Sequence, residues 1–425
     1  MSNLPQGDQS LNYLFNDPIV QHKIAQLKEA DLHISDIVDD AGHQYIDIVL
    51  EGGGTLGMAL LGYLYTLEQL GIRFLCIGGA SAGAIAALLL AAGPIEDAKT
   101  EWIIEKVAHK DFYDFVDGDP DSRNFIDNLL KHRHDDPGVF DTLRRAWYFT
   151  CIIDNLSSNK KGLNPGTEFH NWIKEILAER GITTYGEMRQ MRMKMPQGLR
   201  NRATGKPLGD EFNEEYIELG IVAADITTET RVVFPRMGSL YYPNIDQANP
   251  ADFVRASMSI PLFFRPFEIP NIPTHEGQQD AWRTRCNFYG TIPEKVLFVD
   301  GGILSNFPID IFHDYHKIPS SPTFGVKIGF DRTKCNDTHG FLDYIGAIFW
   351  SSAHSLDNEF IHRNPDFKQL VSFIDYNMKR YSWLDFSLDE DEKLELFKRG
   401  VETAAFFISN FDWEKYKQSR QVVNG

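Results

Sequence analysis

The 425-residue sequence has no long apolar run, few cysteines and no basic excess. Its longest apolar stretch, "AIAALLLAAG", is too short to span a bilayer, and the start, "MSNLPQGDQS", lacks the regions of a signal peptide. The four cysteines form no metal or redox pattern: Cys76, Cys151, Cys286 and Cys335. These absences favour a cytoplasmic protein with free thiols, and leave peripheral contact with membranes open.

The net charge of −18 argues against nucleic acid as a partner. One segment departs from this acidic balance: residues 188–209 contain no acidic residue and six basic ones, Arg189, Arg192, Lys194, Arg200, Arg202 and Lys206. Such a segment could dock onto lipid head groups as a peripheral membrane contact, or it could be an exposed loop. The sequence favours the exposed loop.

A glycine loop, "EGGGTLG", follows the apolar run "YIDIVL" and precedes a helix-like run. Gly52, Gly54 and Gly57 match the spacing of a dinucleotide-binding loop. That function also requires an acidic residue at the end of the next strand, but the next strand, "IRFLCIGG", ends in Gly78 and Gly79. The missing carboxylate argues against a nucleotide site.

The next motif, "GASAG", places Ser81 on a sharp strand-to-helix turn of the kind that exposes a nucleophilic hydroxyl. The two loops belong to one strand–helix–strand unit, whose parallel strands open their loops at the same edge of the sheet. The N–H groups of Gly53, Gly54 and Ala82 can therefore converge beside the Ser81 hydroxyl. This geometry predicts an oxyanion hole for acyl transfer.

The best candidate for the base is Asp300, which ends the apolar strand of "KVLFVDGG". Asp225 ends "ELGIVAAD" and competes with it, although "ITTET" indicates a hairpin there. A Ser-His-Asp triad stays open because several histidines follow Asp300: His313, His316, His339, His354 and His362. His132 and His134 resemble a solvated helix end more than a metal pair, so the sequence predicts neither a metal nor another cofactor.

The motifs "EGGGTLG", "GASAG" and "DGG", in this order, resemble those of the patatin-like phospholipases, and "VRASMSIPLFFRPF" resembles the segment beside that family's active site. The resemblance implies Ser81 as nucleophile, Asp300 as base and Gly52, Gly53 and Gly54 as the oxyanion loop, without histidine. It also implies supporting roles for the other glycines of the motifs: Gly57, Gly79, Gly83, Gly301 and Gly302.

The implied activity is that of a serine lipid acyl hydrolase of the phospholipase A or lysophospholipase type, acting on phospholipids or lysophospholipids. One position departs from the family pattern, because Leu56 stands where the loop usually carries Arg or Lys. Two alternatives remain open: an acyltransferase that uses the same dyad, and a regulated effector or scaffold that needs an activator.

The expected fold is α/β, with a mostly parallel central sheet flanked by helices, as in the patatin-like and FabD/lysophospholipase-like proteins. Residues 1–44 form an N-terminal extension, 45–410 the catalytic domain and 411–425 a C-terminal tail. Within the domain, 94–215 form a helical insertion that could act as a lid. Near the end, Ser387 and Glu390 indicate a capping box, and Gly400 is expected to interrupt or end the helix that follows.

Overall fold

The computed structural model describes residues 11–53, 56–118, 161–314, 317–329, 335, 341–375 and 388–424. Gly54, the whole segment 119–160 with His132 and His134, and also His316 and His339, lie outside these ranges. Among the described residues, no helix combines the length and apolar character needed to cross a bilayer.

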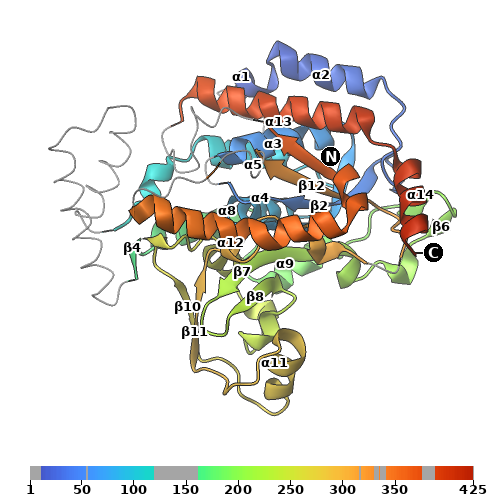
Figure 1. Cartoon of the computed structure of the whole chain (residues 1–425). Helices are drawn as coiled ribbons and strands as arrows, with labels where there is room; N and C mark the ends of the chain where they lie inside the picture. Colours follow the sequence, from blue (N-terminus) through green and yellow to red (C-terminus); the bar gives the residue numbers. More distant parts are fainter. Residues whose placement is uncertain are drawn as a thin grey trace.

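The centre of the fold is a mixed sheet whose middle strands are parallel (Figure 1). Strand β12 (Thr323–Ile328) lies between β13 (Val371–Ile374) and β2 (Gln44–Leu50), and β2 is followed by β3 (Ile72–Ala80) and β7 (Leu219–Asp225). All residues of β3 and β7 are buried. Their near-continuous apolar sequences suit parallel strands that are covered on both faces. The predicted α/β class is confirmed.

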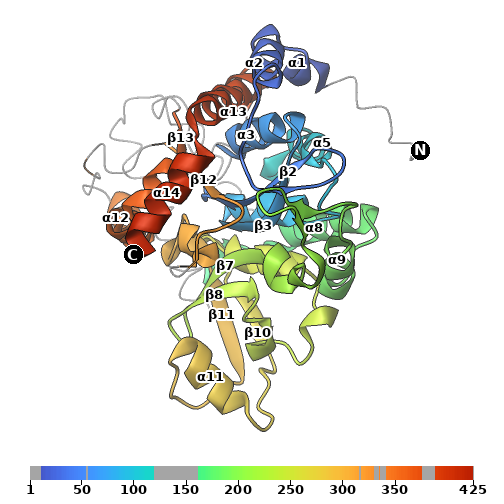
Figure 2. The same ribbon diagram turned by 90° about the vertical axis from the view of Figure 1, so that its right-hand side faces the viewer.

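The strand that precedes Asp300 runs against this central direction. Strand β11 (Lys295–Val299) pairs with β7 in antiparallel fashion, as do β8 (Thr230–Pro235) with β7 and β10 (Phe267–Pro270) with β11. These antiparallel pairs lie at the β7 end of the sheet, and the short strands β1 (Ile37–Val38), β5 (Arg200–Asn201) and β6 (Lys206–Pro207) form further antiparallel pairs next to β2. Figure 2 shows β10 and β11 leading away from the parallel strands toward α11 (Gln278–Cys286).

Helices α3 (Gly57–Gln69) and α13 (Glu390–Asn410) pack closely against each other (Figure 2). A Cβ atom on Gly62 would lie 2.1 Å from the Phe397 carbonyl oxygen, and one on Gly400 would lie 2.0 Å from the Ala59 oxygen. The expectation that Gly400 ends its helix is wrong, because α13 continues through this position and uses the missing side chain for contact. Its capping box consists of Asp389 and Glu392, whereas Ser387 of the expected pair lies outside the described residues.

Both ends of the described chain pack on this core. Helix α2 (Pro18–Lys28) lies against α13. Helix α14 (Trp413–Asn424) buries Trp413, Tyr416 and Arg420, and the Arg420 guanidinium forms a buried ion pair with Asp366 at 3.0 Å. The segment 413–424 is therefore a helix anchored to the core.

The described flanks of the 94–215 segment contain helices and three short strands, and the insertion stays a prediction. The flanks include α5 (Thr100–Ala108), α8 (Thr167–Glu179) and α9 (Tyr185–Arg192). The lid role depends on residues that lie outside the described ranges and stays a prediction.

Replacement of Gly400 by valine tests the helix contact. The added side chain must push α13 away from α3, so we expect the free energy of unfolding to fall by about 3 kcal/mol or more. Urea denaturation followed by circular dichroism measures the change. Gly57→Ala is the matched control, because a Cβ at Gly57 meets no atom within 4 Å. An equal loss in both variants would contradict the close contact.

Candidate active site

Ser81 lies on the turn between β3 and α4 (Ala82–Leu90). Its backbone has φ 51° and ψ −124°, a conformation that costs a residue other than glycine about 1–3 kcal/mol. The turn is also too tight for larger neighbours. A Cβ on Gly79 would lie 2.5 Å from the Gly83 oxygen, and one on Gly83 would lie 2.3 Å from the Leu50 oxygen. The two glycines flanking the serine therefore permit the strained turn.

The register of the sheet brings Ser81 and Asp300 to the same level. Ala80 pairs with Val222 in the parallel direction, and Val299 pairs with Ala224 in the antiparallel direction. The next residue of each strand thus falls beside Ala223. There the Ser81 Oγ donates a hydrogen bond to Asp300 Oδ2 at 2.8 Å. Both side chains are buried, with exposed fractions of 7% and 1%.

The carboxylate of Asp300 has few polar partners. Its Oδ1 accepts the Gly302 N–H at 2.7 Å, and the Asp300 N–H donates to the Ser259 oxygen at 2.9 Å. Burial raises the pKa of Asp300 to about 7, although the hydrogen bonds from Ser81 and Gly302 lower it in part. Gly301 allows this approach, since a Cβ there would lie 2.0 Å from the Val222 oxygen. The carboxyl group is thereby tuned to exchange protons near neutral pH.

The end of α10 (Ala251–Ser257) supports both residues. Ser257 Oγ accepts the Ser81 N–H at 2.9 Å, and Met258 Sδ lies 3.4 Å from Ser81 Oγ. Together with the Ser259 carbonyl, these groups hold the serine and the aspartate from one short segment. The resemblance of "VRASMSIPLFFRPF" placed this segment beside the site, but the sequence did not identify which of its atoms make the contacts.

The glycine loop passes directly beside the serine. A Cβ on Gly52 would lie 2.9 Å from Ser81 Cβ, and one on Gly53 would lie 2.4 Å from Ile328 Cδ1. The Gly52 N–H donates to the Asn306 carbonyl oxygen at 3.1 Å, and Asn306 Nδ2 donates to the Gly52 oxygen at 3.1 Å. The first of these bonds removes the Gly52 N–H from the predicted oxyanion donors.

Two of the other predicted donors can be located. Within the described ranges, no acceptor is found for the Gly53 N–H. Ala82 is the first residue of α4, where an N–H group has no partner inside the helix. Gly54, the third predicted donor, lies outside the described residues, and Gly57 begins α3.

The competing acid, Asp225, serves the β7–β8 hairpin. Its carboxylate accepts bonds from the Thr227 N–H at 2.8 Å and the Thr228 hydroxyl at 2.7 Å, and from the Tyr241 hydroxyl at 3.2 Å. In the described part of the chain, the Ser81 hydroxyl is bonded to Asp300 and Met258, so no described histidine contacts it. The ring of His313, for example, lies 4.5 Å from that of Phe367.

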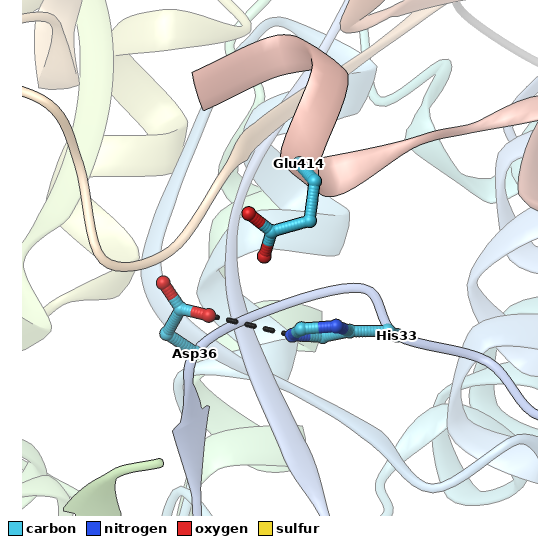
Figure 3. A group of neighbouring side chains, drawn as sticks. All are labelled: His33, Asp36 and Glu414. Atoms are coloured by element: carbon cyan, nitrogen blue, oxygen red, sulfur yellow. Dashed lines mark hydrogen bonds and ion pairs between the residues drawn. The ribbon is translucent and has the colours of Figure 1, made fainter. Parts of the chain in front are cut away.

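One cluster has the composition of a metal site. His33, Asp36 and Glu414 bring potential ligand atoms within 4.8 Å of one another (Figure 3). However, the Lys417 Nζ lies 2.8 Å from both the Asp36 and the Glu414 carboxylate oxygens. The ammonium group of the chain itself neutralises these acids and links the N-terminal segment to α14, so the cluster carries no metal assignment.

The basic segment 188–209 contacts β3 and the residue two positions before β7 through Arg192. The Arg192 guanidinium is buried and donates to the Ile217 oxygen at 2.8 Å. Arg189 pairs with Asp246, Arg200 with Asp40, and Arg202 donates to the Ser35 oxygen. Since four of the six basic side chains have partners within the protein, the structure does not support lipid docking by this segment.

A serine hydroxyl on a strained strand-to-helix turn, bonded to a buried acid beside a glycine loop, is the arrangement typical of serine acyl hydrolases. The family model for patatin-like phospholipases matches residues 48–313. The chain therefore belongs to the patatin-like phospholipases, a family of lipid hydrolases.

Among curated proteins, the chain is similar to the uncharacterized protein YqhO of Bacillus subtilis, with 27% identity over 372 residues, which are 87% of this chain and 100% of YqhO. Among solved structures, it is similar to VipD from Legionella pneumophila, with 16% identity, a TM-score of 0.41 and coverage of 91% of this chain and 73% of VipD. The type III effector ExoU of Pseudomonas aeruginosa follows, with 14% identity, a TM-score of 0.37 and coverage of 88% and 53%. The family assignment rests on the family model.

The raised pKa of Asp300 and its hydrogen bond to Ser81 predict that the reactivity of Ser81 depends on pH. Asp300 can accept the serine proton only when it is ionised, so the reaction with an alkyl fluorophosphonate is expected to accelerate as the pH rises through about 7. Intact-mass spectrometry between pH 5 and 9 measures the rate, with Ser81→Ala as the unlabelled control. A rate that is constant from pH 5 to 8 would indicate an ordinary aspartate or a different base.

Proposed function

We propose that the protein is a serine lipid acyl hydrolase of the phospholipase A or lysophospholipase type that works through a Ser81–Asp300 dyad. The observation that carries this proposal is the 2.8 Å hydrogen bond from Ser81 Oγ to the buried Asp300 carboxylate. The family supplies the lipid substrate class, and the geometry supplies the nucleophile and its base.

The first half of the reaction transfers the acyl group to the protein. Asp300 Oδ2 takes the hydroxyl proton while Ser81 Oγ attacks the ester carbonyl carbon. The negative oxygen that forms is stabilised by the N–H groups of Gly53 and Ala82, and by the positive end of the α4 dipole. As the tetrahedral intermediate collapses, the ester bond breaks and Asp300 returns the proton to the departing alcohol. The product is an acyl-enzyme at Ser81.

The second half repeats these steps with water. Asp300 takes a proton from a water molecule, whose oxygen attacks the acyl carbon. The acyl–oxygen bond to Ser81 then breaks, Asp300 gives the proton back to Oγ, and the fatty acid leaves. A carboxyl pKa of about 7 suits both directions of transfer, because the group is neither too weak a base nor too weak an acid at neutral pH.

The acyltransferase alternative uses the same acyl-enzyme but a different acceptor. An alcohol or thiol in place of water would take the acyl chain through the same proton transfers. The alternative of a regulated effector keeps the dyad and adds a requirement for an activator. In both cases the added component decides whether product forms.

Incubation with a mixed extract of glycerophospholipids and lysophospholipids tests the proposal. We expect the wild type to release free fatty acid, measured by mass spectrometry, and both Ser81→Ala and Asp300→Asn to reduce the rate by at least about 10³-fold. Asp225→Asn is the matched control, since Asp225 is also buried at a strand end but contacts neither Ser81 nor Asp300. Activity that survives Asp300→Asn would show that Asp300 is not the base.

The stability of the Asp300→Asn variant shows whether a loss of activity comes from the missing base or from unfolding of the protein. Because burial raises the pKa of Asp300 in the folded state to about 7, above the ordinary aspartate value of about 3.9, ionisation of Asp300 destabilises the folded state, increasingly as the pH rises from about 4 to 7. Asparagine cannot ionise, so the unfolding temperature of this variant at pH 8 is expected to equal or exceed that of the wild type. A marked drop would point to a structural defect instead.

The choice between water and another acceptor needs a separate assay. With a lysophospholipid or glycerol present, a hydrolase is expected to release mainly free fatty acid. If wild type forms acylated acceptor instead and Ser81→Ala does not, the acyltransferase alternative holds.

A further inference from the structure

A buried ion pair lies directly behind the glycine loop. Lys327, on β12, places its Nζ 2.6 Å from Glu51 Oε1, and the two side chains are only 1% and 2% exposed. The other carboxylate oxygen, Oε2, accepts the Ile328 N–H at 2.6 Å, and the Glu51 N–H donates to the Val326 oxygen at 3.0 Å. Glu51 is therefore fixed to β12 through both its backbone and its side chain, one residue before Gly52.

The same lysine acts on a second buried carboxylate. Asp357, on α12 (Phe341–Arg363), accepts the Ser305 hydroxyl at 2.7 Å and the Phe307 N–H at 2.6 Å. The positive charge of Lys327 lowers the pKa of Asp357 against the larger effect of burial. The Lys327 Nζ also lies 4.7 Å from the centroid of the Phe307 ring. Lys327 thus faces the segment that continues the chain after Asp300, Gly301 and Gly302.

Asn306 connects the glycine loop to the segment that Asp357 holds. It lies between the two residues that Asp357 holds, and it binds Gly52 through its backbone oxygen and its side-chain amide. The network therefore leads from Lys327 through Glu51 to Gly52, and back through Asn306 and its neighbours to Asp357. One side of the network carries the loop with Gly53, and the other carries Asp300.

We propose that Lys327 is a positioning residue that couples the glycine loop to the segment bearing Asp300, so that the oxyanion donors and the base keep one relative geometry. The proposal rests on the proposed function, because it assigns Lys327 a role in that reaction. Two buried charges are costly unless they are paired and well bonded, and this pair is joined by a 2.6 Å contact and a further bond from the Ile328 N–H to Glu51. The lysine does not touch the reacting atoms and acts through Glu51 and Gly52.

The substitution Lys327→Met removes the charge and keeps most of the side-chain volume. Loss of one oxyanion donor lowers kcat by about 10²–10³-fold, so we expect kcat to fall by at least about 10²-fold while KM stays within about threefold. The matched control is Arg420→Met, which breaks the other described ion pair of similar burial, with Asp366, at 2% and 4% exposure. It is expected to lower the unfolding temperature as well, but to leave kcat within about threefold.

The double variant Glu51→Gln/Lys327→Met separates positioning from charge balance. Removing both charges is expected to restore much of the thermal stability without restoring kcat. If kcat returns to within about threefold of wild type, or if Arg420→Met lowers it as much as Lys327→Met, the proposal is overturned. A folded Lys327→Met variant with unchanged kcat also overturns it.

Asn306→Ala provides the test if Lys327→Met does not fold. It leaves no unpaired charge but removes the amide bond to Gly52, and a fall in kcat of about tenfold or more at constant KM is expected. Wild-type turnover that Ser81→Ala abolishes establishes the proposed function independently. If the wild type releases no fatty acid, the proposed function fails, and the rate of Ser81 labelling by an alkyl fluorophosphonate then reports the geometry; equal rates in wild type and Lys327→Met contradict the positioning role.

Discussion

The site depends on the hydrogen bond between Ser81 and Asp300, and this bond depends on the register of three strands. β3 and β11 reach β7 from opposite directions and end at the same level, beside Ala223. A shift of one residue in either pairing would turn the side chain to the other face of the sheet. Gly301 keeps the strands this close, since any side chain there would collide with the Val222 carbonyl. Burial at this junction then raises the pKa of the carboxyl group to a range useful for catalysis.

The local motifs predicted much of this arrangement. The small residues around Ser81 indicate a turn that only they can form, and "DGG" after an apolar strand indicates an acid at a strand end. The sequence could not show that β11 runs antiparallel to β7, because strand direction depends on pairing with distant segments. The two residues meet because both strands end beside Ala223.

Other differences also arise from long-range contacts. Gly400 has low helix propensity and suggests the end of a helix, but α13 continues because α3 packs against the bare backbone. The family resemblance implied that Gly52 belongs to the oxyanion loop, whereas the Gly52 N–H donates to the Asn306 carbonyl oxygen. The basic segment 188–209 was expected to be an exposed loop, with lipid docking as the alternative, but part of it is helix α9 and most of its basic side chains have partners elsewhere in the chain. In each case the distant residue that makes the contact could not be identified from the local sequence.

The structure of a covalent adduct tests the central claim most directly. A crystal structure of the protein after reaction with an alkyl fluorophosphonate is predicted to show phosphorus bonded to Ser81 Oγ, with the phosphoryl oxygen about 2.7–3.1 Å from the nitrogens of Gly53 and Ala82. Asp300 is predicted to remain beside Oγ. An adduct on another residue, or a phosphoryl oxygen directed away from the glycine loop, would contradict the account.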